Sequence, residues 1–474
     1  MVAAGTERKR RGAWFTPEHL VDTVVRAVVD QPFVGARHGR TLRILDPACG
    51  DGRFLTAAVD AVRRLGGDAQ AVGVDIDAHT VRLVADSTAA EVICDDALTS
   101  DWLAEQAGTF DLVIGNPPFL SQLASATTRG GASSRGGGPY ADAAVEFLAL
   151  AADLVDPAGG RVAYVLPQSI LSARDAGGVR RRFDDSSTMF WSAWTGERDF
   201  DAQVVTCALA FEFGRTSHVD GRHAATTWSH VVTDRSGVPP VPGALDGGEP
   251  PAGRLGDRAR LNANFRDEYY GMVAAVGDHD VGPPLVTSGL IDPGRCRWGE
   301  RPVRFAKRRF VAPRIDVAAL DDRMVAWAEK RLVPKVLIAN QTPIIEAVCD
   351  PGGDWLPGVP VVAAYPLATA DPTEAVWEIA AVLSAPAVSA WAWHQRGGTG
   401  LSSTTIRIGP TMLAELPWPT GSVAAAVDAL RRGDVVTCGD LVDAAYGIDA
   451  EERSVLRDWW RPIYERVTVT RTER

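Results

Sequence analysis

The chain has 474 residues, 46% hydrophobic and 23% charged, and a formal net charge of -11, which indicates a globular protein of two or three domains without a basic surface throughout. No apolar run of about 18 residues occurs and no hydrophobic stretch follows the basic N-terminus, so we expect a cytoplasmic protein that is neither secreted nor membrane-spanning. Six cysteines lie far apart without a Cys-x-x-Cys pair, which indicates free thiols and neither a disulfide framework nor a metal site.

The first predicted element is an amphipathic helix near the N-terminus. Within residues 18–33 the apolar side chains recur at helical spacing, directly after the sequence Gly12-x-x-x-Thr16-Pro17. Threonine is a good N-cap, and proline is favoured at the first helical position. The sequence therefore predicts a helix that Thr16 caps and that Pro17 begins.

The next element is a short apolar strand that leads through a glycine turn into a helix. Its sequence, LRILDPACGDGRFL, has Gly50 and Gly52 in the turn, where they permit a tight bend and close approach of a ligand. The third glycine of a dinucleotide-binding fingerprint is missing, because Leu55 stands there. The turn carries the carboxylates Asp46 and Asp51, which would repel a pyrophosphate but suit a ligand with a cationic end.

Polar residues also end the strands that follow. The strand AVGVDID includes Asp75, placed where a carboxylate can accept hydrogen bonds from ribose hydroxyls, and the strand EVICDDAL includes Asp95 and Asp96. A cap or turn role is the commoner one for any single aspartate. Four strands that alternate with helical patterns and all end in polar residues nevertheless predict an α/β fold, a Rossmann-like doubly wound sheet with one site along its edge.

The fourth strand, DLVIG, is stopped by Asn116-Pro117-Pro118-Phe119. Two consecutive prolines fix φ and offer no N–H, so they hold Asn116 and Phe119 rigidly at the C-terminal end of the strand. In an open parallel sheet that edge is where ligands bind. A plain proline-terminated strand is the structural alternative.

About twenty residues rich in Ser, Gly, Thr and Arg follow Phe119. Such a segment cannot bury enough apolar surface to order itself. It leaves directly from the expected site and carries Arg129 and Arg135. A surface loop and a lid that closes on the substrate are both consistent with this composition.

The C-terminal half begins after a Pro/Gly-rich stretch, residues 233–256, which predicts a linker between domains. Residues 295–335 then carry twelve Lys and Arg against five acidic residues. In an acidic protein such a segment indicates local contact with a polyanion, although a solvated basic face is the structural alternative. Residues 391–408 read as a polar, glycine-rich loop whose side chains can reach phosphates or base edges, and residues 438–460 as a helix, a glycine turn and a second helix.

The order of these motifs resembles that of the gamma class of amino-directed, S-adenosylmethionine-dependent DNA methyltransferases. Over residues 10–215 the chain has Gly-x-x-x-Thr-Pro, Asp-Pro-Ala-Cys-Gly-x-Gly, two acidic strand ends and Asn-Pro-Pro-Phe, in that order. The resemblance implies a methyltransferase catalytic domain at residues 1–232, the linker at 233–256 and a mixed α/β target-recognition domain at 257–474. Family members often have tyrosine where this chain has Phe119, so ring stacking is kept and the hydroxyl is lost.

The resemblance also implies the cofactor S-adenosyl-L-methionine and assigns residues to it. The acceptors Asn116 and Pro117 would bind the hydrogens of the target amino group, and Phe119 and Phe200 would stack on the flipped base. The cofactor would contact Thr16, Pro17, Asp46, Ala48 and Gly50 at its methionine end, Asp75 at its ribose, and Ile76 and Asp96 at its adenine. Candidate DNA contacts are Arg304, Lys307, Arg308, Arg309, Arg396 and Arg407.

The implied activity is site-specific methylation of adenine N6 in double-stranded DNA. A monomer on DNA, nucleoid association and a separate restriction endonuclease or other defence component as partner are further expectations. The same Asn-Pro-Pro motif serves enzymes that methylate protein glutamine or ribosomal RNA bases, and a catalytically silent cofactor-binding specificity module is a third reading. Cytosine N4 methylation also remains open, although serine usually replaces Asn116 in that branch.

Overall fold

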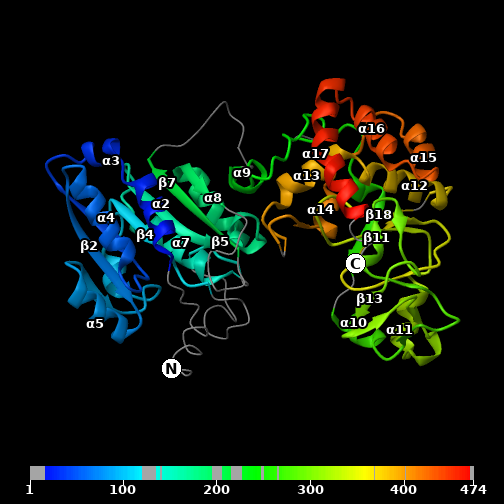
Figure 1. Cartoon of the computed structure of the whole chain (residues 1–474), viewed down its shortest axis with the longest axis horizontal. Coiled ribbons are helices and arrows are strands. Elements are labelled where there is room, and N and C mark those ends of the chain that lie inside the picture. Colours follow the sequence, from blue (N-terminus) through cyan, green and yellow to red (C-terminus); the bar gives the residue numbers. More distant parts are fainter. Residues whose placement is uncertain are drawn as a thin grey trace. The chain divides into compact units, whose positions relative to one another are not determined.

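The computed structural model describes residues 16–119, 135–138, 141–194, 205–214, 227–246, 250–263, 266–367, 369–400 and 402–469. The chain divides into two compact units, residues 1–231 and residues 232–474, which we call the first and the second unit. Figure 1 shows a central sheet with helices in the first unit and a mixture of short strands and helices in the second.

The first unit is built on a seven-stranded sheet in the order β3-β2-β1-β4-β5-β7-β6. The strands β1 to β5 run parallel, and β7 lies antiparallel to both β5 and β6. This arrangement is the predicted doubly wound sheet. The strands are β1 (Thr41–Asp46), β2 (Asp68–Asp75), β3 (Glu91–Cys94), β4 (Leu112–Gly115), β5 (Arg161–Pro167), β6 (Ser187–Ala193) and β7 (Thr206–Phe213).

Helices cover both faces of this sheet. On one face, α2 and α4 pack with Ile44, Leu112 and Ala163 in one apolar cluster. The intervening strand residues Leu45 and Val113 are also fully buried and lie outside that cluster, so the other face is covered as well. The helices are α2 (Glu18–Val28), α3 (Gln31–Gly35), α4 (Arg53–Arg64), α5 (Ala78–Ser87), α6 (Asp101–Glu105), α7 (Ala143–Leu154), α8 (Gly177–Ser186) and α9 (Thr227–Thr233).

The strand order reverses between β1 and β4, which are hydrogen-bonded neighbours. Their carboxyl ends therefore lie side by side with connections that diverge to opposite sides of the sheet. In open α/β sheets this switch point is where ligands bind. It brings together the segments after Asp46 and after Gly115.

The second unit contains a four-stranded antiparallel sheet in the order β18-β16-β20-β8. The helix α12 packs against β16, β18 and β20. The helices α15 and α16 pack on α12, α17 packs on α13 and α16, and α14 packs against β8. The strands are β8 (Ala259–Ala263), β16 (Lys335–Ile338), β18 (Ala347–Asp350) and β20 (Val362–Pro366), and the helices are α12 (Pro372–Leu383), α13 (Pro386–Arg396), α14 (Pro410–Ala414), α15 (Ala424–Arg431), α16 (Val435–Ala445) and α17 (Ala450–Val469).

A smaller lobe of the second unit has an apolar core of its own, which includes Met272, Phe305, Phe310, Met324 and Trp327. Around this core lie two helices and two short antiparallel strand pairs. They are α10 (Arg266–Met272), α11 (Asp322–Glu329), the hairpin β13 (Val303–Phe305) with β14 (Arg308–Phe310), and β9 (Val276–Gly277) with β15 (Arg314–Ile315).

Remaining short strands of the second unit connect these parts. They pair as β10 with β19, β11 with β12, and β17 with β21. Their bounds are β10 (Leu285–Val286), β11 (Ile291–Asp292), β12 (Arg295–Cys296), β17 (Gln341–Thr342), β19 (Leu356–Pro357) and β21 (Ile406–Arg407).

Two sequence-based expectations at helix boundaries are wrong. The helix α2 begins at Glu18 with Pro17 at the cap position, and the Thr16 side chain does not cap it. The expected polar loop at 391–408 is helical up to Arg396, because α13 is buried on nearly all sides. His394, within this stretch, is buried, with its Nε2 2.9 Å from the Pro239 carbonyl oxygen.

Two further expectations are confirmed. α16 and α17 are the two helices expected within residues 438–460, and they are joined through Gly447, whose φ is 80°. The six cysteines are free thiols.

Among the described residues, no group of three or more His, Cys, Asp or Glu could hold a metal ion. No single described helix is long and apolar enough to cross a membrane, although α12 and α13, bent by 68°, would pass together by length and composition alone.

Candidate active site

The candidate site lies at the switch point, where the Asp46 carboxyl at the end of β1 meets Gly115 at the end of β4. A Cβ atom at Gly115 would lie 2.4 Å from Asp46 Oδ1. This separation is too short for any real contact, so only glycine lets the two strand ends approach in this way. The position of Asp46 therefore requires a glycine directly before Asn116.

Asp46 is a buried carboxyl group without an ion-pair partner among the described residues. It is 2% exposed, and its Oδ1 accepts a hydrogen bond of 3.0 Å from the Ala48 N–H. Burial raises the pKa of Asp46 to about 8; the bond from Ala48 opposes this rise, and the charges of Asp75 and Asp51 add to it. Within the described ranges no Lys, Arg or His forms an ion pair with it. A ligand with a positive charge would satisfy this carboxylate.

The Tyr164 hydroxyl contributes a second polar group to the same region. Tyr164 stands beside Gly115 in the register of β4 with β5 and is 1% exposed. Burial, and then the Asp46 charge, raise its pKa. Its hydroxyl has no hydrogen-bond partner among the residues that the structure describes. A buried hydroxyl of this kind is available to a ligand or a water molecule.

The glycine turn after β1 is held against the end of β2. The Gly50 N–H donates to Asp75 Oδ2 over 3.0 Å, and the Asp77 N–H donates to Asp75 Oδ1 over 2.8 Å. Gly50 and Gly52 have φ values of 51° and 75°, which other residues adopt at a cost. These bonds hold the Asp75 carboxylate in one orientation at the end of β2.

An exposed apolar residue and a further acid follow along the same edge. Ile76 is 63% exposed although it directly follows a buried strand. The Asp95 N–H donates to the Asp75 carbonyl over 3.1 Å, which places the end of β3 beside Asp75. Asp96 Oδ1 accepts from the Leu98 N–H at 3.0 Å. The edge thus offers acceptors on both sides of an apolar surface, as a nucleoside requires.

The Asn116 side chain is tied to the N-terminal motif. Its Nδ2 donates to Thr16 Oγ1 over 3.0 Å, and Thr16 is 6% exposed. The Thr16 carbonyl in turn accepts from Arg53 Nη1 over 3.0 Å, and Arg53 pairs with Asp51 at 2.7 Å. This bond fixes the Asn116 side-chain amide, with its nitrogen on the Thr16 hydroxyl.

The remaining catalytic candidates are only partly within the described structure. Pro117 is buried, and Phe119 is half-buried against the core of the first unit. Phe200, expected to stack on a base, and residues 120–134, with Arg129, lie outside the described residues. Arg135 donates to the Leu98 carbonyl over 3.1 Å and lies 3.5 Å from Asp153, so this end of the segment read as a surface loop or a lid is anchored to the first unit.

The DNA-contact candidates lie in two places of the second unit. Arg304, Lys307, Arg308 and Arg309 are exposed on the hairpin of β13 and β14. Arg396 is the last residue of α13, where burial, and then the charge of Arg407, lower its pKa. Arg407 is exposed on β21.

Sequence reasoning did not single out Gly115, Tyr164 or Arg53. The Gly115 requirement depends on a carboxyl that lies 69 positions earlier in the chain, and Tyr164 reads simply as part of a buried strand. Arg53 follows the glycine turn without any local signal of its bond to Thr16. Only the packing of distant segments reveals these three residues.

Part of the chain is similar to known methyltransferases. Residues 2–187 match the family model described as N-6 DNA Methylase. A Type II methyltransferase M.CvrRI of Paramecium bursaria Chlorella virus XZ-6E is 32% identical over 117 residues, 24% of this chain and 26% of that protein. A Ribosomal RNA small subunit methyltransferase C of Chromohalobacter salexigens is 35% identical over 82 residues, 17% of this chain and 23% of that protein. The chain thus spans about a quarter of the length of these curated relatives.

Among solved structures, the type IIG restriction endonuclease BpuSI aligns with 98% of this chain and 68% of its own, with 11% identity and a TM-score of 0.38. The matched segment 2–187 contains β1 to β5 and the residues Thr16, Asp46, Asp75 and Asn116. Together with the sheet order, this match confirms the predicted methyltransferase fold and its cofactor, S-adenosyl-L-methionine.

Proposed function

We propose that this chain is a site-specific DNA methyltransferase that transfers a methyl group from S-adenosyl-L-methionine to N6 of a flipped-out adenine in double-stranded DNA. The observation that carries this proposal is the position of Asn116. It lies at the end of β4, beside Asp46 and bonded to Thr16, in a segment that matches the N-6 DNA Methylase family. The order of its motifs favours the gamma class of this family.

The residues at the sheet edge have the charge and hydrogen-bonding groups that the cofactor would need. The buried Asp46 carboxylate would take the ammonium group of the methionine end, between Thr16, Pro17, Ala48 and Gly50. The Asp75 carboxylate, already oriented by two N–H groups, would accept the ribose hydroxyls. The exposed Ile76 side chain would pack on the adenine ring, and Asp96 would accept from its amino group.

When bound, the cofactor supplies an electrophilic methyl group on a positively charged sulfur. An exocyclic amino nitrogen is a weak nucleophile, because its lone pair is conjugated with the ring. Asn116 Oδ1 and the Pro117 carbonyl would accept its two hydrogens and favour the pyramidal nitrogen of the transition state. The nitrogen would gain the methyl group as the sulfur releases it, and the surplus proton of the amino group would pass to solvent.

The two prolines would make the backbone that carries these acceptors rigid. They fix the direction of the Pro117 carbonyl, so the acceptors need little rearrangement during the reaction. Phe119 would stack on the target base once it has left the duplex, and Phe200 would hold its other face. A base that stays inside the helix cannot bring its amino group to the end of β4.

Residues 1–232 would form the catalytic domain, residues 233–256 the connection and residues 257–474 the target-recognition domain. We infer a monomer on DNA that works beside a separate restriction endonuclease or another defence component. A ribosomal RNA base is the second candidate substrate, supported by the likeness to a ribosomal RNA methyltransferase over 82 residues.

The decisive experiment supplies purified protein with radiolabelled cofactor and, separately, genomic DNA, ribosomal RNA and total protein. We expect label in DNA and modified adenines at one sequence when the DNA is mapped by single-molecule sequencing. The Asn116→Ala variant should lose about 100- to 1,000-fold in kcat while cofactor affinity, measured by calorimetry, stays within a few-fold. Label that enters RNA or protein and never DNA overturns the proposal.

A further inference from the structure

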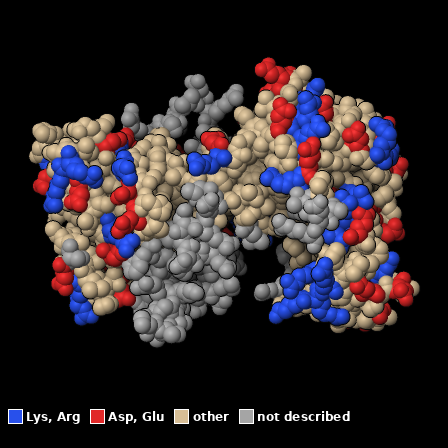
Figure 2. Space-filling view, in the orientation of Figure 1, with Lys and Arg blue, Asp and Glu red and all other residues tan. Residues whose placement is uncertain are grey.

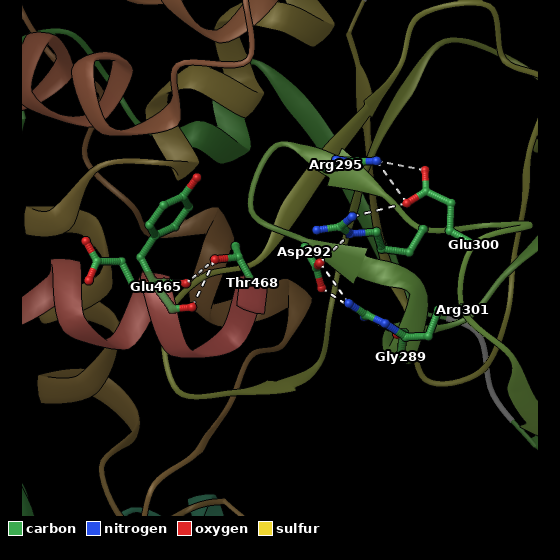
Figure 3. A network of polar contacts seen from close by, with 9 residues as sticks. Gly289, Asp292, Arg295, Glu300, Arg301, Glu465 and Thr468 are labelled. Atoms are coloured by element: carbon green, nitrogen blue, oxygen red, sulfur yellow. Dashed lines mark hydrogen bonds and ion pairs between the residues drawn. The ribbon is translucent and has the colours of Figure 1, made fainter. Parts of the chain in front are cut away.

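The twelve cations of residues 295–335 differ sharply in what they contact. Arg297 Nε and Arg301 Nη2 lie 2.7 and 2.9 Å from Asp292 Oδ2, and Asp292 is fully buried. Arg295 pairs with Glu300 at 2.9 Å. Figure 3 shows this network at β11 and β12, together with Glu465 and Thr468 of the C-terminal helix α17. These arginines serve the fold, and so does Lys335, which is buried and paired with Asp350.

The hairpin of β13 and β14 is different, because its cations are not neutralised. Arg304, Lys307, Arg308 and Arg309 are all exposed, and none forms an ion pair with an acidic side chain in the part of the chain that the structure describes. Lys and Arg side chains gather over the region of β13 and α10 in Figure 2. The hairpin thus places four exposed cations within six residues, Arg304 to Arg309.

The register of the hairpin places two of these cations directly opposite each other. Arg304 pairs with Arg309 across the two strands, and Val303 pairs with Phe310 on the other face, which is buried. Like charges that face each other across a strand pair destabilise a hairpin. A polyanion on the outer face would convert this repulsion into attraction.

The turn of the hairpin is strained as well. Ala306 and Lys307 have φ values of 48° and 64°, in the left-handed region that two-residue turns usually fill with Asn-Gly. Strained backbone of this kind is retained mainly where it serves function. Here it presents the Lys307 side chain at the tip of the hairpin.

The base of the hairpin is firmly held. Asp278 accepts hydrogen bonds from the N–H groups of Val311 at 3.1 Å and Ala312 at 2.8 Å. The Phe305 ring lies 4.9 Å from the Tyr269 ring, and Phe310 is buried in the same core. The hairpin thus presents its cations on a rigid support. Because the support is rigid, the hairpin loses little conformational entropy when it binds a ligand.

We propose that the β13–β14 hairpin enters the major groove of duplex DNA, with Arg304 and Arg309 on phosphates and Lys307 at the tip toward the base edges. The choice of DNA rests on the proposed function. Geometry supports it, because the major groove of B-form DNA, about 12 Å wide, admits a two-stranded ribbon. The major groove of A-form RNA is too deep and narrow for side chains to read.

The test is equilibrium binding of a fluorescent duplex by the full chain, followed by anisotropy at several salt concentrations. The variant Arg304→Gln/Arg309→Gln should bind at least tenfold more weakly at 100 mM salt. The slope of log K against log salt should fall by about 1.8, because two phosphate contacts are lost. The matched control is Arg323→Gln/Lys330→Gln, which removes two exposed charges from α11 and its C-cap in the same lobe and should stay within twofold of wild type.

Two further measurements address the groove and the turn. Methyl green, which occupies the major groove, should compete with the protein, whereas netropsin, which occupies the minor groove, should not. Ala306→Asn should raise the melting temperature and keep DNA affinity, while Ala306→Asn/Lys307→Gly should raise it and weaken binding. Melting curves of every variant establish that it is folded.

The inference is overturned if Arg304→Gln/Arg309→Gln binds duplex DNA as wild type does, if the α11 control weakens binding equally, or if a duplex RNA shows the same loss as DNA. Methylation of DNA by wild-type protein reports on the proposed function independently. If the wild-type protein methylates DNA and the hairpin variant binds DNA as tightly as wild type, only the proposal about the hairpin is refuted. If the hairpin variant loses DNA binding and the wild-type protein does not methylate DNA, only the proposed function is refuted.

Discussion

Asp46 shows how one buried group links the site to the pH dependence of the whole chain. Its pKa of about 8 lies far above the usual range of an aspartate, so between about pH 4 and pH 8 the folded state holds a proton that the unfolded state has released. The free energy of unfolding therefore falls as the pH rises through this window. Burial, which is the largest cause, also makes the site ready for a cation.

We predict that Asp46→Asn removes this part of the pH dependence. Wild-type protein should lose stability, on the order of a few kcal/mol, between pH 5 and pH 8, and the variant should lose less. Urea unfolding at both pH values measures the difference, and Asp443, whose pKa burial also raises to about 8, contributes equally to both proteins. Identical pH dependence in the two proteins would show that Asp46 is ionised throughout. Affinity for S-adenosyl-L-methionine should fall at least tenfold in the variant.

Thr16 was expected to line the cofactor, and the structure adds a bond from its hydroxyl to Asn116. We predict that Thr16→Val lowers kcat at saturating cofactor by about 10- to 100-fold, because the Asn116 amide loses the acceptor that orients it. Thr16→Ser keeps the hydroxyl and should restore most of the rate. Calorimetry of cofactor binding distinguishes this role from simple lining of the cofactor. A residue that only lines the cofactor would change its dissociation constant and leave kcat at saturating cofactor unchanged.

At the scale of elements, the contact between the ends of β1 and β4 is the most sensitive point. Gly115→Ala would place a methyl group against the Asp46 carboxyl, so we predict a loss of about 1–3 kcal/mol in stability together with weaker cofactor binding. Gly35→Ala in α3 is the matched control, because no atom lies within 4 Å of a Cβ there. Thermal melts that show equal losses for both variants would contradict this reading of the strand ends.

Other elements show where local patterns succeed and fail. The strands β1 to β5 and the pair β16 and β18 follow from apolar runs bounded by glycine, proline and aspartate, which are local signals. The helix α13 was read as a loop from position 391 onward, because polar residues and glycines crowd its end. Its Trp391 and Trp393 are buried, and tertiary packing carries the helix to Arg396.

For the whole molecule, the sign of the charge matters less than its distribution. With a net charge of -11 the chain as a whole repels a polyanion at long range. Most of the paired arginines of residues 295–335 are held by Asp292 and Glu300, which leaves the β13–β14 hairpin as a concentrated basic feature. Binding of duplex DNA should therefore depend steeply on salt, as the anisotropy series measures.

The sequence by itself determined the succession of strands and the chemistry at their ends, from the glycine turn to Asn116-Pro117-Pro118-Phe119. It could do so because apolar runs, glycines and prolines act on their immediate neighbours. Only the tertiary structure decided which of these residues meet. Asn116 and Thr16 are 100 positions apart, and the Asp46 carboxyl lies against Gly115 because β1 and β4 are neighbours at the switch point. Which arginines are neutralised and which remain exposed likewise depends on contacts between side chains, and no local pattern encodes them.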